Sequence, residues 1–147
     1  MIQIKQITDI NSLMKWRREV IENVFEQVPS EELLEQNKSF YHRHLNDNSH
    51  LAYVAFVDEK EAGCGSICLT EELPSPDNTS GRCAYLMNIY VRERFREKGV
   101  GHEIVKRLIN EAKLRDCKKI YLETTAEGRP VYESLGFHDL PDIMKLK

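Results

Sequence analysis

Hydrophobic residues recur with two different spacings along this chain, and each change of spacing marks a predicted element. The isoleucines Ile2, Ile4 and Ile7 indicate a short first strand. A helix follows, with Thr8 or Asp9 as its N-terminal cap. Its predicted buried stripe consists of Ile10, Leu13, Met14, Val20, Ile21, Val24, Phe25 and Val28. Trp16, Arg17 and Arg18 are expected on the other faces of this helix.

A second helix is predicted after Ser30, whose hydroxyl can accept a bond from an amide of the first turn. Its apolar positions are Leu33, Leu34, Phe40, Tyr41 and Leu45, a less regular stripe that indicates partial exposure. Residues 51–57 are nearly all apolar, which is typical of a central strand, and residues 58–61 predict a polar hairpin turn. The return strand, 62–70, contains Gly63 and Gly65, which indicate a bulge or close packing. Residues 73–81 are rich in turn formers and predict a surface loop.

The stretch from Tyr85 to His102 carries the strongest local signal. Its first half is rich in Tyr, Ile and Val, which favours a buried strand, and from Val100 the apolar residues follow a helical period. Between the two lies Arg96-x-x-Gly99-x-Gly101. The first amides of a helix have no acceptor inside the helix, and glycines let an anion approach them closely. The stretch therefore predicts a strand, a basic turn that can bind phosphate, and a helix.

The remaining pattern completes one α+β domain over residues 1–147. Residues 118–123 predict a strand, residues 130–135 a short helix that Gly136 ends, and residues 137–146 a final strand interrupted by Pro141. The predicted order is β-α-α-β-β-β-α-β-α-β, with a central mixed, mostly antiparallel sheet flanked by helices. We find no internal repeat and no linker.

Composition narrows the class of protein. The formal net charge of −3 argues against a nucleic-acid partner, and no apolar run has the length of a membrane span. The cysteines Cys64, Cys68, Cys83 and Cys117 show no metal-binding spacing, so we interpret them as small buried residues of a cytoplasmic protein. His42, His44 and His50 lack acidic or cysteine partners at suitable spacing, so we expect solvated surface histidines and no metal site.

Residues 85–102 resemble the cofactor-binding segment of the GNAT superfamily of N-acetyltransferases, and Tyr132-Glu133-Ser134-Leu135-Gly136-Phe137 resembles its Y-x-x-x-G-F signature. The order of elements is similar to the GNAT fold over the whole chain. The resemblance implies acetyl-CoA as cosubstrate, with its pyrophosphate over the two glycines, and no metal. The cofactor-binding residues that it implies are Ile89, Tyr90, Val91, Arg96, Glu97, Lys98, Gly99, Val100, Gly101, His102 and Thr125.

Acetyl transfer from a thioester needs a proton for the departing thiolate, and a tyrosine with a pKa near 10 can supply it. We predict that Tyr132 is this general acid. The alternative is a structural tyrosine that stabilises the short helix by packing. Many members of the superfamily carry a glutamate as general base in the fourth strand, where this chain has Met87. Glu123 and Asn88 are the nearest polar candidates for the acceptor site, although Glu123 is equally compatible with a solvated, structural role.

Two functions therefore stay open. The first is transfer of an acetyl group to a primary amine of a small molecule or peptide by direct attack. The second is a catalytically silent acyl-CoA-binding or sensor domain. Glu19, Glu22 and Glu26 on the first helix indicate a cationic acceptor, unless they form an ordinary solvated helix face. A homodimer is also predicted, because a C-terminal strand at a sheet edge invites pairing.

Overall fold

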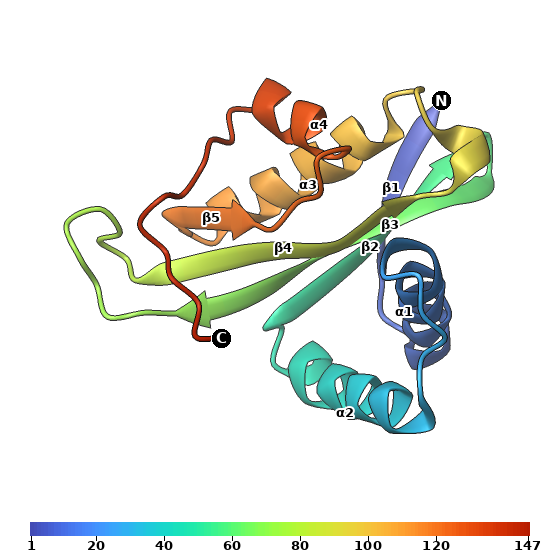
Figure 1. Ribbon diagram of the computed structural model, residues 1–147, viewed down its shortest axis with the longest axis horizontal. Helices are drawn as coiled ribbons and strands as arrows, with labels where there is room; N and C mark the ends of the chain where they lie inside the picture. Colours follow the sequence, from blue (N-terminus) through green and yellow to red (C-terminus); the bar gives the residue numbers. More distant parts are fainter.

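The computed structural model describes all 147 residues, which form one five-stranded sheet covered by helices on both faces (Figure 1). In chain order the elements are β1 (Ile2–Ile7), α1 (Ile10–Val24), α2 (Glu31–Asn46), β2 (His50–Val57), β3 (Lys60–Glu71), β4 (Arg82–Val91), a 3-10 turn η1 (Glu93–Phe95), α3 (Val100–Leu114), β5 (Lys119–Leu122) and α4 (Arg129–Ser134). The strands lie side by side in sequence order. Neighbouring strands are antiparallel except β4 and β5, which are parallel because the crossover helix α3 joins them.

Two hydrophobic cores lie on opposite faces of the sheet. Alternate side chains of β2 supply both, since successive residues of a strand point to opposite faces. Leu51 and Tyr53 belong to the core under α3, and Ala52 and Val54 belong to the core under α1 and α2. Figure 1 shows α3 and α4 on one side of the sheet and α1 and α2 on the other.

The β2–β3 hairpin and the glycines of β3 follow the predicted pattern. Asp58 and Glu59 have φ angles of 49° and 70°, the left-handed backbone of a two-residue hairpin turn. A Cβ atom on Gly63 would lie 2.5 Å from the carbonyl oxygen of Tyr90, and one on Gly65 would lie 2.6 Å from Ile104 Cγ2. Close packing of α3 and β4 on β3 therefore excludes a side chain at both positions.

The first helix differs from its prediction at both the end and the buried face. α1 ends at Val24, so Val24, Phe25 and Val28 are exposed and do not extend the stripe. Trp16 is fully buried, because it lies three residues after Leu13 and four before Val20 and so shares their face. The prediction that placed Trp16 on another face was wrong.

The predicted final strand within residues 137–146 was also wrong. These residues form no strand: the chain turns after Gly136 and runs as an irregular segment to the C-terminus. Pro141 cannot donate a ladder hydrogen bond, and four of the segment's apolar side chains, those of Leu140, Ile143, Met144 and Leu146, are exposed. β5 is therefore an edge strand of the sheet. No helix of the protein has the length and apolar composition of a membrane span.

Candidate active site

A gap opens where β5 stops and β4 continues. The parallel pairing joins Cys83–Leu86 of β4 to Lys119–Leu122 of β5, and β4 then runs on to Val91 without this neighbour. Figure 1 shows β4 extending well past the tip of β5. The backbone groups of Met87–Val91 on this side consequently have no strand partner, and an extended ligand can use them.

A β-bulge bends β4 at the start of the gap. Ser66 faces Met87 and Cys64 faces Tyr90, so two residues of β4, Asn88 and Ile89, lie opposite Gly65 alone. Asn88 takes a left-handed backbone with a φ angle of 55°, which asparagine adopts more readily than most residues. Bulges increase twist and redirect side chains, and this one lies between the gap and the face covered by α1 and α2.

The turn before α3 presents backbone amides at the same end of β4. Gly99 has a φ angle of 82°, and the first helical bond runs from the Glu103 amide to the Gly99 carbonyl at 3.1 Å. No side chain caps this helix, so the amides of Val100, Gly101 and His102 lack an acceptor. A Cβ on Gly99 would meet nothing within 4 Å. The turn therefore offers open space and free donors, which fits a phosphate group.

The cofactor-binding residues predicted from the sequence are brought together here. Arg96 Nε donates a hydrogen bond of 2.9 Å to the Val91 carbonyl, and a Cβ on Gly101 would lie 3.7 Å from Val91 Cγ2. The end of β4 and residues 96–102 thus form one continuous surface. Thr125 follows β5, and its hydroxyl accepts a long bond of 3.4 Å from the Gly128 amide in the turn into α4.

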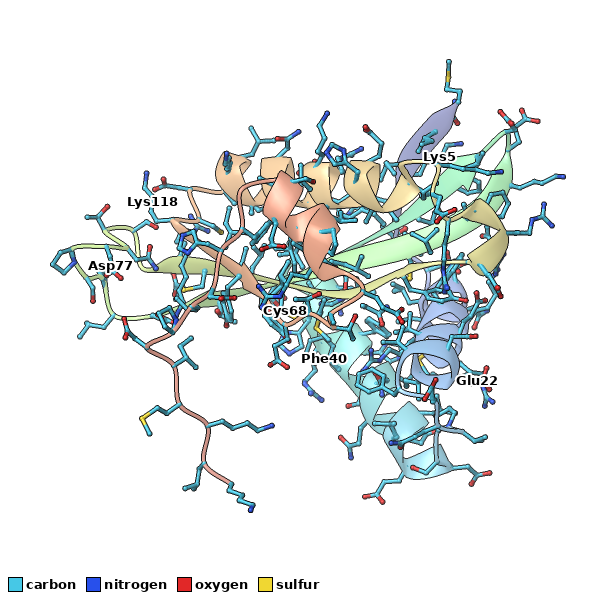
Figure 2. All side chains as sticks on the ribbon, turned by 45° about the horizontal axis from the view of Figure 1, so that its top comes forward. Lys5, Glu22, Phe40, Cys68, Asp77 and Lys118 are labelled. Atoms are coloured by element: carbon cyan, nitrogen blue, oxygen red, sulfur yellow. The ribbon has the colours of Figure 1, made fainter.

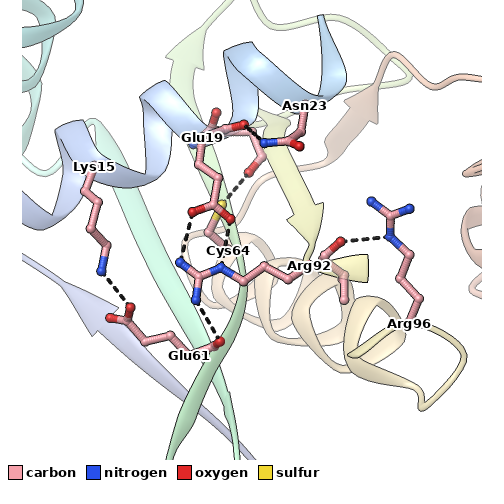
Figure 3. A network of polar contacts seen from close by, with 9 residues as sticks. Lys15, Glu19, Asn23, Glu61, Cys64, Arg92 and Arg96 are labelled. Atoms are coloured by element: carbon pink, nitrogen blue, oxygen red, sulfur yellow. Dashed lines mark hydrogen bonds and ion pairs between the residues drawn. The ribbon is translucent and has the colours of Figure 1, made fainter. Parts of the chain in front are cut away.

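An ion pair that the sequence analysis missed ties this surface to α1 (Figure 3). Arg92 donates bonds of 2.8 and 2.9 Å to the two carboxylate oxygens of Glu19 and a third of 3.2 Å to the Glu61 carbonyl. Its guanidinium also lies 4.4 Å from the centre of the Trp16 ring. The hydrogen bonds from Arg92 are the main reason that the pKa of Glu19 lies below its ordinary value. The carboxylate of Glu19 is therefore paired with Arg92 and does not offer a free negative charge to an acceptor, as had been expected from the sequence.

The predicted general acid, Tyr132, lies on α4 and is half-buried beside the main core. Its ring packs edge-on against Phe137, with 6.0 Å between the ring centres. Burial alone raises the pKa of its hydroxyl, so the proton is held through the neutral range. Tyr132 and Glu123 line one cavity of about 650 Å³ between β5, α3, α4 and the C-terminal segment. Glu123 is exposed, and its charge contributes, after burial, to the raised pKa of Tyr85.

The third catalytic candidate, Asn88, lies in a different cavity, of about 290 Å³, between α1, α2 and strands β2, β3 and β4. The residues that line it are Arg17, Leu33, Gln36, Asn37, Phe40, Tyr41, His50, Ser66, Cys68, Met87 and Asn88. Figure 2 shows Phe40 and Cys68 at the contact of α2 with the sheet. Arg17 Nη1 donates a bond of 2.8 Å to Asn88 Oδ1, which fixes the amide group of Asn88. Asn88 is neutral and has its oxygen occupied, so it suits orientation of a ligand better than proton abstraction.

The buried groups of this cavity are held neutral. His50 is only 3% exposed, so the prediction of a solvated histidine was wrong at this position. Burial is the main reason that the pKa of His50 is lowered to about 4, and the positive charge of Arg17 adds to this shift. Burial also raises the pKa of Tyr41 to about 12. Both side chains therefore stay uncharged near neutral pH, and Arg17 is the charged residue among those that line the cavity.

With this geometry in place, the chain can be compared with known proteins. The model of the Acetyltransferase (GNAT) family matches residues 10–137, and the chain belongs to this family. A glucosamine 6-phosphate N-acetyltransferase of Arabidopsis thaliana is 27% identical over 87 residues. The match covers 56% of this chain and 56% of that relative, so it spans about half of the relative's length.

Solved structures agree with the family. A predicted acetyltransferase of Clostridium acetobutylicum, crystallised with acetyl-CoA, is 26% identical with a TM-score of 0.85, over 100% of this chain and 96% of that chain. The Arabidopsis glucosamine-6-phosphate N-acetyltransferase is 21% identical with a TM-score of 0.72, over 100% and 98% of the two chains. The enzyme AAC(6')-Iy, in complex with a bisubstrate analogue of CoA and acetylneamine, is 16% identical with a TM-score of 0.76, over 100% and 97%. The last two show the shared fold, which confirms the α+β GNAT architecture predicted from the sequence.

Proposed function

We propose that this protein transfers the acetyl group of acetyl-CoA to a primary amine by direct attack. The observation that carries the proposal is the gap beside β4, with free strand backbone at one end and the unpaired amides of α3 at the other. A ligand with an amide-bearing arm and a pyrophosphate fits both features at once. Acetyl-CoA in the related Clostridium structure supports the choice of cosubstrate.

The pyrophosphate is placed over residues 96–102. The amides of Val100, Gly101 and His102 are the donors, and the dipole of α3 favours negative charge at this end. The pantetheine arm then runs along Ile89–Val91 in the gap. Its thioester then lies near the bulge at Asn88. Backbone donors fixed in this way stabilise the oxyanion that forms on the thioester carbonyl.

The reaction then needs two proton movements. The neutral amine attacks the thioester carbonyl carbon, and the tetrahedral intermediate collapses as its bond to sulfur breaks. Tyr132 donates its proton to the leaving thiolate, which gives CoA, and the attacking nitrogen loses one proton to solvent. The Tyr132 phenolate then takes a proton back from solvent, so no net proton is gained or lost by the protein. Burial keeps the Tyr132 hydroxyl protonated before the reaction. Asn88 orients the acceptor, and Glu123 lines the same cavity as Tyr132.

The test is an acetyl-CoA assay over a panel of amines, with release of the CoA thiol as the signal and calorimetry for binding. The panel includes amino sugars and their phosphates, because a relative is named for glucosamine 6-phosphate, together with small amines, peptides and aminoglycosides. Transfer to any of them supports the enzyme. Tight binding of acetyl-CoA without transfer or hydrolysis across the panel would favour the catalytically silent binding domain. Failure to bind acetyl-CoA would overturn both.

A further inference from the structure

Arg17 is an arginine without a carboxylate partner in the cavity next to the bulge. Its hydrogen bonds go to two neutral side-chain amides, 2.9 Å from Nε to Asn37 Oδ1 and 2.8 Å from Nη1 to Asn88 Oδ1. Its sequence neighbour Arg18, in contrast, is exposed and lies 3.8 Å from Glu22. Ion pairing satisfies most half-buried arginines of this protein, for example Arg92 with Glu19. Arg17 is the exception.

The two amides orient the guanidinium and leave part of it free. A guanidinium has five N–H donors, of which these bonds use two, so three remain for a ligand. Arg17 is half-buried on α1 and packs with its Cζ atom 5.8 Å from the centre of the Phe25 ring. Neither an aspartate nor a glutamate lines the cavity. A fixed, partly desolvated positive charge with free, planar donors is suited to bind a carboxylate or a phosphate.

The cavity around Arg17 limits the size of the ligand. Its volume of about 290 Å³ is at the lower end of the range for small-molecule sites. His50 lies in its wall, is buried, and has a ring nitrogen, Nε2, without a hydrogen-bond partner. A buried polar atom without a partner is costly unless a ligand or water satisfies it. The site therefore combines one charged anchor, one buried polar atom without a partner and mainly apolar wall surface.

Asn88 connects this anchor to the reacting centre. Its side chain contacts Arg17, and its backbone forms the bulge of β4 beside the gap. A molecule whose oxyanion binds Arg17 consequently reaches the bulge with a group only a few bonds away. On the basis of the proposed function, we infer that the acceptor is a small primary amine that carries a carboxylate or phosphate, with Arg17 as the residue that selects it.

This inference reverses the expectation of a cationic acceptor. That expectation rested on Glu19, Glu22 and Glu26, but Glu19 is bound to Arg92, and none of the three lines the cavity. A diamine would bring a second positive charge next to Arg17 and be repelled. A large peptide would exceed the cavity, although its terminal residue could enter.

The experiment compares acceptors that differ only in the oxyanion: O-phosphoethanolamine with ethanolamine, and β-alanine with propylamine. Binding to the CoA-loaded protein is measured by calorimetry, and transfer by release of the CoA thiol. The variants are Arg17→Gln, Arg17→Lys, which keeps the charge but not the planar fork, and the matched control Arg18→Gln. Thermal unfolding and CoA affinity of each variant establish that it is folded.

The parent protein should prefer the oxyanion-bearing member of at least one pair by about ten- to a hundredfold in affinity or in kcat/KM. Arg17→Gln should abolish this preference, Arg17→Lys should retain part of it, and Arg18→Gln should behave like the parent. Equal binding within both pairs, a preference for the neutral amines, or no binding by any of the four would overturn the inference. Binding through Arg17 without acetyl transfer would support the anion site and refute the proposed function instead.

Discussion

Gly101 offers a test in which stability and cosubstrate binding should change in opposite directions. Gly101 is the second residue of α3 and its φ angle is not in the left-handed region. A Cβ atom there would lie 3.7 Å from Val91 Cγ2, an ordinary van der Waals contact, so Gly101→Ala fits the free protein without strain. Alanine reduces the freedom of the unfolded chain, which stabilises a helical site by roughly 0.5–1 kcal/mol. For a chain of this length the midpoint of thermal unfolding should rise by about 1–4 °C.

Acetyl-CoA should bind this variant more weakly. The added methyl group occupies the space between Val91 and the turn, where the pyrophosphate is placed. Displacing the pyrophosphate from even one amide loses a hydrogen bond to a charged group, worth about 1.5–3 kcal/mol. Since about 1.4 kcal/mol corresponds to a factor of ten, the dissociation constant should rise by about ten- to a hundredfold.

The measurement is calorimetric titration of acetyl-CoA beside thermal unfolding of the same samples. S-Acetylpantetheine, which lacks the pyrophosphate, is the matched ligand: its interaction should not distinguish Gly101→Ala from the parent. Gly99→Ala is a poorer variant, because the φ angle of 82° makes any side chain strained there and would lower stability as well. If Gly101→Ala binds acetyl-CoA within about threefold of the parent while its unfolding midpoint rises, the pyrophosphate does not lie over this amide.

Four further predictions test other parts of the structure. Tyr132→Phe should lower the transfer rate by about ten- to a thousandfold with little change in CoA affinity, and the parent's rate should rise from pH 7 to 9 as the amine loses its proton. If the variant turns over like the parent while chemistry is rate-limiting, Tyr132 has only a structural role. Glu19→Gln should lower the free energy of unfolding by about 1–2 kcal/mol at pH 7 and by less below pH 4. The pKa of Glu19 is lowered in the folded protein, so the stabilisation by its carboxylate is lost as that group protonates in acid. An equal effect of the substitution at both pH values would contradict this. The pKa of His50 is about 4 in the folded protein and 6.5 ordinarily, so between these pH values only the unfolded chain gains a proton. The free energy of unfolding should therefore fall from pH 6.5 toward 4 by up to about 1.4 kcal/mol per pH unit. His50→Gln should reduce this dependence of stability on pH, and an identical dependence would exclude a buried neutral histidine. The predicted homodimer now rests on the open edge of β5 and on the exposed apolar C-terminal segment. Sedimentation at tens of micromolar should show a dimer, and truncation after Asp139 should abolish it. A 17.2 kDa species alone would contradict the predicted dimer.

The sequence alone determined the elements whose apolar period is regular and whose ends carry strong signals. The strand, basic turn and helix from Tyr85 onward are found where predicted, because β-branched residues, the left-handed Gly99 and the apolar face of α3 agree locally. The hairpin at Asp58 and the packing constraint at Gly63 were predictable for the same reason. The family also follows from this stretch and from the signature at Tyr132.

Tertiary structure decided what depends on contacts between distant segments. Residues 137–146 had an apolar composition compatible with a strand, but Pro141 interrupts the segment and the segment does not pair with the open edge of β5. Trp16 and Arg17 are adjacent in sequence, yet the docking of α1 buries one against β4 and turns the other toward Asn88, 71 residues away. Local patterns record which side chains prefer burial. They do not show which charged groups form ion pairs, because such pairs join residues far apart in the sequence. The pairing of Glu19 and the free donors of Arg17 could therefore be identified only in the folded protein.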